Sequence, residues 1–311
     1  MAKHNPHMET GPGDNDYKPI GTVVAELQPL YPEISASSLR FLERERLVEP
    51  HRSPGGHRLY SPADVQRIRL IKEWQARRLS LAEIRNRLDE LGQIPSSADL
   101  RDRALALYLD GWTREAQILL LAHDPGQLDL AAMFGEVLTP ILVEVGTRWE
   151  SGELEVSQEK EISESIREVI VELSIRHRDP ESQGPILVAA TVRGELHELG
   201  LRMICGILGE AGYQVVFLGA NAAPEHIGEA VRRHRPAAVL LSTGTTRGLA
   251  SVQETIDTIA ALDLSPAPHL LVGGAGVVGN EDAVRAMGAS PVQTFGYTEL
   301  AAELGRLLAW P

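Results

Sequence analysis

The residues with the clearest capacity for chemistry are Glu195 and His197, a carboxylate and an imidazole two positions apart, followed by Gly200. A histidine ring can give one nitrogen to a metal ion while a neighbouring carboxylate accepts the other ring N–H, which fixes the tautomer. A glycine one turn later allows a bulky ligand to approach the backbone. A single histidine in a loop is more often structural, so the residues around it must decide. On chemistry alone, His197 is the candidate metal ligand and Glu195 the group that orients it.

Four small residues favour a ligand site over a structural histidine. Ser242 and Thr243 follow one apolar run, and Gly273 and Gly274 follow the next. Ligands of open α/β sheets bind at the carboxyl ends of the strands, which is where the loop containing His197 is expected. Small side chains at successive strand ends leave a groove. We expect a long ligand, such as a nucleotide tail, to insert there.

A regular alternation of apolar runs and amphipathic segments positions these residues. The apolar runs occupy residues 186–190, 215–219, 237–242 and 269–274. Each run is short and apolar on both faces, as in a buried parallel strand, and each intervening segment is long enough for a crossover helix. The pattern predicts a doubly wound, Rossmann-like α/β domain of about five strands over residues 185–311.

A strand followed by Glu-x-His-x-x-Gly, with small residues at the next strand ends, resembles the cobalamin-binding domain shared by methionine synthase and the mutases. The resemblance implies that His197 replaces the dimethylbenzimidazole base beneath cobalt and is the lower axial ligand. The cofactor-binding residues that it implies in this domain are Glu195, His197, Gly200, Ser242, Thr243, Gly273 and Gly274. The usual Ser-x-Leu motif is Ser242-Thr243-Gly244 here, so packing around the nucleotide tail is expected to differ.

Residues 97–178 show apolar side chains at spacings of three and four, which predicts a bundle of about four helices. Within this segment Trp149 and Glu159 lie on two helical stretches joined at Gly152. An indole and a carboxylate so arranged can cap one face of a ligand. The alternative is a tryptophan buried in the core at the end of a helix.

Beside a cobalamin domain, this segment resembles the helical bundle of light-sensing repressors of the CarH/LitR type. The resemblance implies adenosylcobalamin as the chromophore, with Trp149 and Glu159 over its adenosyl face and Lys160 next to them. That family commonly has histidine directly after the glutamate, and some members have one beside the tryptophan that captures cobalt after photolysis. Lys160 and Glu150 occupy those positions here, and neither suits cobalt at neutral pH. We therefore expect either release of cobalamin after light or a second, bilin-like tetrapyrrole.

Residues 34–47 predict a helix with Ser35 as its N-cap, and residues 49–60 predict a basic hairpin that turns at Pro54-Gly55-Gly56. Hydroxyl and arginine side chains near a helix N-terminus suit contacts with phosphates and base edges. The order of helix, hairpin and two further helical segments resembles the MerR family across residues 20–91. The resemblance implies a winged helix-turn-helix that acts as a dimer on near-palindromic, double-stranded operator DNA. The candidate DNA-binding residues are Ser37, Arg40, Arg52, His57, Arg58 and Tyr60.

The net charge of the chain, -13, is unevenly distributed. Residues 18–93 carry 13 basic and 10 acidic side chains, whereas the rest of the chain carries 17 and 33. A mildly basic module on an acidic body fits a DNA-binding head whose remaining surface avoids the polyanion. The single cysteine excludes an internal disulfide, and the lack of an apolar run of about 18 residues argues against a transmembrane helix. We expect a cytoplasmic protein with no membrane partner.

The chain is thus predicted to be multidomain, with a disordered leader over residues 1–17 and a winged helix-turn-helix head over residues 18–93. A four-helix bundle that caps the cofactor would follow over residues 97–178, and then the cobalamin-binding domain. No sustained heptad pattern follows Leu91, so a homo-oligomer, dimer or tetramer, is expected to form through the later domains. The leading hypothesis is a cobalamin-dependent, light-responsive repressor, and the alternative is a regulator that senses its ligand without photochemistry. An enzyme is not expected, because a substrate barrel needs about 200 further residues.

Overall fold

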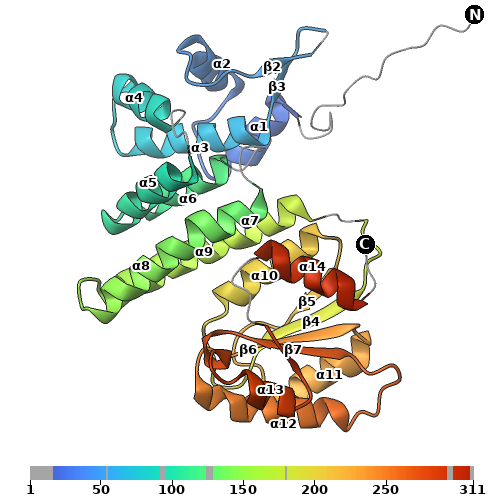
Figure 1. Cartoon of the computed structure of the whole chain (residues 1–311). Coiled ribbons are helices and arrows are strands. Elements are labelled where there is room, and N and C mark those ends of the chain that lie inside the picture. The colour runs from blue at the N-terminus through green and yellow to red at the C-terminus, as the bar shows by residue number, and fades with distance from the viewer. Residues whose placement is uncertain are drawn as a thin grey trace, which may run out of the picture. The chain divides into compact units, whose positions relative to one another are not determined.

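The structure, a computed structural model, describes residues 17–53, 55–91, 96–123, 129–178, 181–292 and 297–308 (Figure 1). It divides into two compact units, Met1–Pro95 and Ser96–Pro311. The first unit corresponds to the predicted head, and the second holds both the predicted bundle and the predicted α/β domain. Apart from Tyr17, the predicted leader lies outside the described residues, as does Pro54 of the predicted hairpin turn.

The first unit consists of short helices and a small antiparallel sheet with the strand order β1-β3-β2. Its elements are β1 (Lys18–Pro19), α1 (Ile20–Leu27), α2 (Ala36–Arg44), β2 (His51–Arg52), β3 (Arg58–Tyr60), α3 (Pro62–Ala76) and α4 (Leu81–Leu91). Strands β2 and β3 form the predicted hairpin, in which His51 pairs with Leu59 and Arg52 with Arg58.

Helix α2 begins where the sequence predicts. The Ser35 hydroxyl accepts the Ser38 backbone N–H at 3.1 Å, and the Ser38 hydroxyl accepts the Ser35 backbone N–H at 2.9 Å. This reciprocal capping box satisfies backbone donors that the first turn of a helix leaves unpaired. Leu39 and Leu42 are buried on the inner face of α2. The helix ends at Arg44, earlier than predicted, and the left-handed backbone of Arg46 (φ 55°) cannot continue it.

The second unit opens with four helical rods, as predicted. They are α5 (Ser97–Leu109), α6 (Thr113–Ala122), a continuous rod made of α7 (Leu130–Ala132), a π-helical turn (Met133–Leu138) and α8 (Thr139–Glu150), and finally α9 (Val156–His177). By length and composition Leu130–Glu150 could cross a membrane, but this is weak evidence. The core helix of a soluble protein meets the same criteria, and Phe134, Val137 and Ile141 of this rod are buried inside the bundle.

The chain then forms a five-stranded sheet in which all neighbouring strands are parallel, with the order β5-β4-β6-β7-β8. The strands are β4 (Ile186–Thr191), β5 (Gln214–Phe217), β6 (Ala238–Ser242), β7 (His269–Gly273) and β8 (Ser290–Pro291). The helices between them are α10 (Leu199–Glu210), α11 (Pro224–His234), α12 (Leu249–Ala260), α13 (Glu281–Ala286) and α14 (Tyr297–Leu308). The predicted doubly wound α/β domain is confirmed.

Helices cover both faces of this sheet, with α10 and α14 on one face and α11, α12 and α13 on the other (Figure 1). Side chains alternate between the two resulting cores along β4: Leu187 and Ala189 enter the first core, and Val188 and Ala190 enter the second. Because β4 is flanked by β5 on one side and β6 on the other, the connections diverge between β4 and β6. The carboxyl ends of these two strands therefore border the crevice in which such sheets bind ligands.

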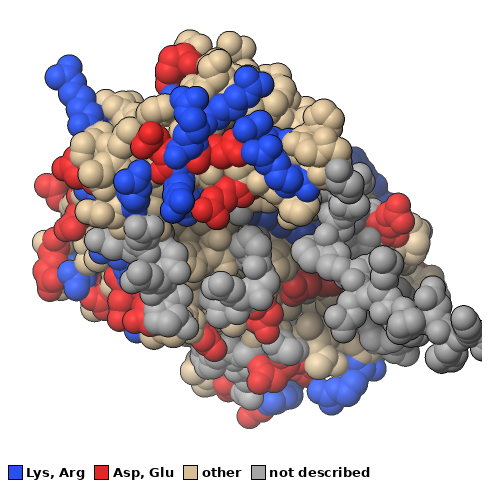
Figure 2. Space-filling view, turned by 90° about the horizontal axis from the view of Figure 1, so that it is seen from above, with Lys and Arg blue, Asp and Glu red and all other residues tan. Residues whose placement is uncertain are grey.

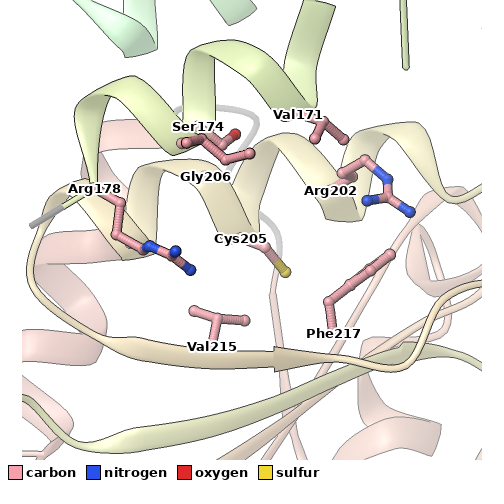
Figure 3. A pocket seen from close by; sticks show the side chains of 10 residues that line it. Val171, Ser174, Arg178, Arg202, Cys205, Gly206, Val215 and Phe217 are labelled. Atoms are coloured by element: carbon pink, nitrogen blue, oxygen red, sulfur yellow. The ribbon is translucent and has the colours of Figure 1, made fainter. Parts of the chain in front are cut away.

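The bundle packs on the α/β domain mainly through α9 and α10. Gly206 of α10 faces Ser174 of α9 (Figure 3), and a Cβ at Gly206 would overlap the Ser174 hydroxyl and come within 3.1 Å of the Phe134 ring. Beside this contact, α9, α10 and β5 enclose a cavity of about 170 Å³ whose lining includes Cys205 and Phe217. Burial raises the pKa of the Cys205 thiol to about 12, so the thiol is not a ready nucleophile.

Gly206→Ala is expected to lower the free energy of unfolding of the apoprotein by about 1–3 kcal/mol, because the added methyl group overpacks the contact between α9 and α10. Gly200→Ala on the same helix is the matched control, since a Cβ there meets no atom within 4 Å. Thermal unfolding followed by circular dichroism compares the two variants with the wild type. A Gly206→Ala protein as stable as the wild type would contradict the close packing of these helices.

Candidate functional site: a histidine loop for cobalamin and a basic face for DNA

The loop after β4 is held in place by a network centred on Thr191. The buried Thr191 hydroxyl donates to the Glu195 backbone carbonyl at 2.6 Å and accepts the Asn221 backbone N–H at 3.0 Å. Asn221 in turn donates its backbone N–H to the same carbonyl at 2.9 Å and accepts the Gly194 N–H at 2.7 Å through its side-chain oxygen. These contacts bring the Glu195 side chain under the loop, at the carboxyl end of the sheet.

The Glu195 carboxylate holds His197. One oxygen accepts the His197 backbone N–H at 2.8 Å and contacts ring atom Nδ1 at 2.7 Å, and the other accepts the Gly244 N–H. Burial by itself would raise the pKa of Glu195, but these hydrogen bonds outweigh it and the pKa is lowered. Glu195 is therefore ionised at neutral pH. Its contribution to stability is present above its unfolded pKa and is lost as the pH falls through the lowered folded pKa.

The two side chains of this pair differ sharply in exposure. The Glu195 side chain is only 6% exposed, whereas the His197 side chain is 92% exposed. An ionised carboxylate can only accept hydrogen bonds, so in the neutral ring Nδ1 carries the proton and Nε2 keeps its lone pair. The neutral imidazole thus presents Nε2 outward, in the tautomer that binds a metal ion through this nitrogen. This geometry fits the predicted role of His197 as the lower ligand of cobalt.

A cavity of about 790 Å³ adjoins His197. Its lining includes, from the α/β domain, the predicted residues His197, Gly200, Ser242, Gly273 and Gly274. Gly274 has a left-handed backbone (φ 97°), and a Cβ there would lie within 2.9 Å of the Thr243 backbone carbonyl carbon, so a side chain would be excluded. The size of the cavity and its small lining residues fit a nucleotide tail.

Thr243 does not fit its expected role as a lining residue. Its side chain is fully buried, and its hydroxyl donates to the Thr245 carbonyl at 3.0 Å, so it stabilises the loop after β6 from within. The next residue, Gly244, takes its place in the cavity wall and also donates its backbone N–H to Glu195. Gly244, in place of the usual leucine, therefore lets the Glu195 carboxylate approach the backbone of the loop after β6. A Cβ at this position would lie 2.7 Å from a Glu195 carboxylate oxygen.

Among the lining residues that the sequence did not predict, three join the bundle to the α/β domain. Gly135 and Thr139 come from the bundle, and Tyr297 comes from the first turn of α14. The Thr139 and Tyr297 hydroxyls lie 2.9 Å apart, which connects the bundle to the α/β domain at the cavity wall. Gly135 lies in the π-helical turn, an irregularity that often marks functional sites. The sequence carries no signature of this turn, so it could not have pointed to Gly135.

The predicted upper cap lies on the two helices of the α8–α9 hairpin. Trp149, at the end of α8, is 44% exposed, so the alternative of a core tryptophan is wrong. Glu159 on α9 accepts the Ser163 hydroxyl at 2.8 Å and lies 3.2 Å from the Lys160 ammonium, which is itself exposed. These three side chains are not part of the cavity wall around His197. Their role above the cofactor stays a prediction.

Five of the six candidate DNA-binding residues fall into two groups. Ser37 and Arg40 on α2 and His57 in the hairpin are exposed, as a contact with DNA requires. Arg52 and Arg58 both donate to the Glu43 carboxylate, at 2.6 and 2.5 Å. Viewed from above, the head shows Lys and Arg side chains gathered with carboxylates among them (Figure 2).

Tyr60 requires a correction, because its side chain is fully buried. Strand β3 lies between β1 and β2, and Tyr60 pairs with Lys18 of β1, so its ring belongs to the core of the head. Buried in this way, Tyr60 supports the hairpin and does not offer its ring to DNA.

The fold and the site together define a class of protein: a winged helix-turn-helix head joined, through a helical bundle, to a Rossmann-like cobalamin-binding domain. Residues 185–304 match the B12 binding domain family, and residues 32–91 match the MerR HTH family of regulatory proteins. The HTH-type transcriptional repressor CarH of Myxococcus xanthus is 30% identical over 228 residues, which cover 68% of this chain and 75% of that protein. This chain therefore belongs to the CarH-type, cobalamin-binding MerR regulators.

Corrinoid proteins are also similar to this chain. Monomethylamine corrinoid protein 1 of Methanosarcina barkeri is 26% identical over 139 residues, which cover 43% of this chain and 64% of that protein. The solved structure of the Methanosarcina barkeri monomethylamine corrinoid protein superposes with a TM-score of 0.58 at 18% identity, covering 68% of this chain and all of that one. At that identity the superposition establishes a shared fold.

Glu195→Gln is expected to weaken cobalamin binding by about 10–100-fold, because the amide cannot accept N–H bonds through both of its polar atoms and so no longer fixes the His197 tautomer. Glu198→Gln is the matched control: it makes the same change directly after His197, in a carboxylate that forms an ion pair with Arg202 at 2.8 Å. Titration of the apoproteins with adenosylcobalamin, followed in the visible spectrum, measures both affinities. Equal losses in the two variants would show that Glu195 does not orient His197.

Proposed function

We propose that this protein is a transcriptional repressor that holds operator DNA in the dark, with adenosylcobalamin bound, and releases it in light. One observation carries the proposal: the buried Glu195 carboxylate fixes a highly exposed His197 ring with its Nε2 facing outward, at the mouth of a cavity sized for a nucleotide tail. The MerR-type head is the reason to propose regulation rather than catalysis. The similarity to corrinoid proteins supports cobalamin binding and does not by itself favour either role.

Each part of the chain has a distinct role in this proposal. His197 would bind cobalt from below, and Gly200 and Gly274 would leave room for the cofactor and its tail. Trp149 and Glu159 would cover the upper face from the bundle. When bound, adenosylcobalamin supplies a cobalt–carbon bond that visible light breaks. Trp149 and Glu159 would lose their contacts with the cofactor once the adenosyl group is gone. The bundle would then no longer be held against the cofactor, and the conformational equilibrium of the protein would shift away from the form that binds DNA.

The homo-oligomer, dimer or tetramer, stays a prediction in this proposal, as does cytoplasmic location. A dimer is supported by the MerR-type head, because two heads can contact the two halves of a near-palindromic operator. Similarity to a DNA-binding repressor supports location with the DNA.

The operator sequence is first selected: the wild-type protein, loaded with adenosylcobalamin in the dark, enriches it from a random pool of duplexes. Fluorescence anisotropy with a labelled duplex of that sequence then tests the proposal. Tight binding is expected in the dark and weak binding after green illumination. His197→Ala should bind weakly in both conditions, because it loses the lower ligand. Equal binding by the wild type before and after illumination would reject the light response and leave a regulator that senses cobalamin without photochemistry.

A second candidate concerns the upper face, and the observation that favours it is the identity of Glu150 and Lys160. Both side chains are exposed beside the predicted cap, and neither offers the neutral imidazole that the resemblance associates with the light-adapted state. The protein would then either release cobalamin after light or hold a second, bilin-like tetrapyrrole at this face. A visible spectrum of the protein purified from cells that make both kinds of tetrapyrrole distinguishes these alternatives.

Glu150→His is expected to create a photoproduct in which cobalt has two imidazole ligands, because it places a ring nitrogen beside Trp149. Ser151→His, one position further along the chain, is the matched control and should behave as the wild type. Visible spectra after illumination report the ligands in each protein. A bis-imidazole spectrum in the illuminated wild type would contradict the expectation that Glu150 and Lys160 leave the upper face of cobalt without an imidazole ligand.

A further inference from the structure

Three charged side chains of the head form a single ion-pair cluster, hereafter the wing clamp. Glu43 lies in the last turn of α2, and Arg52 and Arg58 lie on the paired strands β2 and β3 of the hairpin. One Glu43 oxygen accepts an Arg52 N–H at 2.6 Å, and the other accepts the Arg58 Nε–H at 2.5 Å. The carboxylate thus connects the helix that is expected to enter the DNA groove to both strands of the wing.

The wing clamp is ionised and only partly withdrawn from water. Burial would raise the pKa of Glu43, but the hydrogen bonds from Arg58 and Arg52 outweigh it and the pKa is lowered. The side chains are 21% exposed for Glu43, 27% for Arg58 and 51% for Arg52. The cluster therefore offers phosphates one net positive charge, although it contains two guanidinium groups.

A carboxylate and a phosphate compete for the same guanidinium geometry, since both accept paired N–H bonds from arginine. DNA that contacts the head only through its backbone gains little from these arginines, because it must first displace Glu43 and then tolerate the displaced carboxylate nearby. DNA that also provides base contacts to α2 has additional binding energy with which to open the clamp.

We propose that Glu43 is a specificity-determining residue that withholds the charge of Arg52 and Arg58 from non-specific DNA. The proposal rests on DNA binding by the head. It predicts that Glu43 weakens binding to arbitrary sequences more than binding to the operator, so the ratio of the two affinities depends on this carboxylate.

The first test compares Glu43→Gln with Glu49→Gln in the full-length protein loaded with adenosylcobalamin in the dark. Glu49 is an exposed carboxylate of the same head, so the control removes the same charge without touching the wing clamp. On a labelled duplex of random sequence, the slope of log affinity against log salt should steepen by about 0.9 in Glu43→Gln, the value of one added phosphate contact. The loss of affinity between roughly 50 and 200 mM salt should then grow about 3.5-fold.

On the operator sequence selected from a random pool, Glu43→Gln should change affinity less than on random DNA, so discrimination falls. Weaker binding to both DNAs would mean that Glu43 merely positions the wing, and would overturn the proposal. An equal steepening in Glu49→Gln would also overturn it, because the effect would then come from net charge alone. If the wild type binds neither DNA, the DNA-binding role fails and the wing clamp fails with it.

A second comparison does not depend on the stability of Glu43→Gln. Arg52→Gln in the wild-type background should leave affinity for random DNA nearly unchanged, because Glu43 already occupies Arg52. In the Glu43→Gln background the same change should reverse the steeper salt slope, which is the coupling expected of side chains in direct contact. Loss of random-DNA affinity in the single Arg52→Gln variant would show that this arginine is already available to phosphate.

Discussion

The structure of the sensor depends on one buried carboxylate. Removing an ionised carboxylate from water is costly unless hydrogen bonds replace the lost hydration, and Glu195 obtains them from the His197 ring, the His197 backbone and Gly244. Those donors come from the loops after two different strands, β4 and β6. A single side chain therefore fixes the histidine, joins both loops that border the crevice and sets which imidazole nitrogen faces outward.

The sheet supplies the setting for that carboxylate. Its strand order makes the loops after β4 and β6 diverge, and Gly244, Gly273 and Gly274 at the ends of β6 and β7 add no side chain to the cavity wall. The bundle completes the wall through Gly135, which lies against the Tyr297 ring, and Thr139, whose hydroxyl meets that of Tyr297. A ligand in this cavity would touch both the α/β domain and the bundle.

Local patterns in the sequence were sufficient for strands β4 to β7, the four helical rods, the Ser35 cap and the His197 loop, since apolar runs, cap residues and motif spacing act over short distances. Side-chain orientation could not be predicted in the same way. Tyr60 is buried because a two-residue strand, β1, pairs with β3, and Thr243 turns inward where Gly244 lines the cavity. The meeting of Thr139 with Tyr297 and of Glu43 with two arginines depends on tertiary packing, for which no single segment carries a signal.

The central claim, that His197 binds cobalt through Nε2, is tested most directly by electron paramagnetic resonance of the protein loaded with cob(II)alamin. The unpaired electron couples to the nitrogen below cobalt, so the pattern identifies that nitrogen when protein histidine carries the heavy isotope of nitrogen and the cofactor does not. We predict that the triplet splitting of the unlabelled sample becomes a doublet in the labelled one. A triplet that persists after labelling would mean that the dimethylbenzimidazole base remains on cobalt, and would contradict the role of His197.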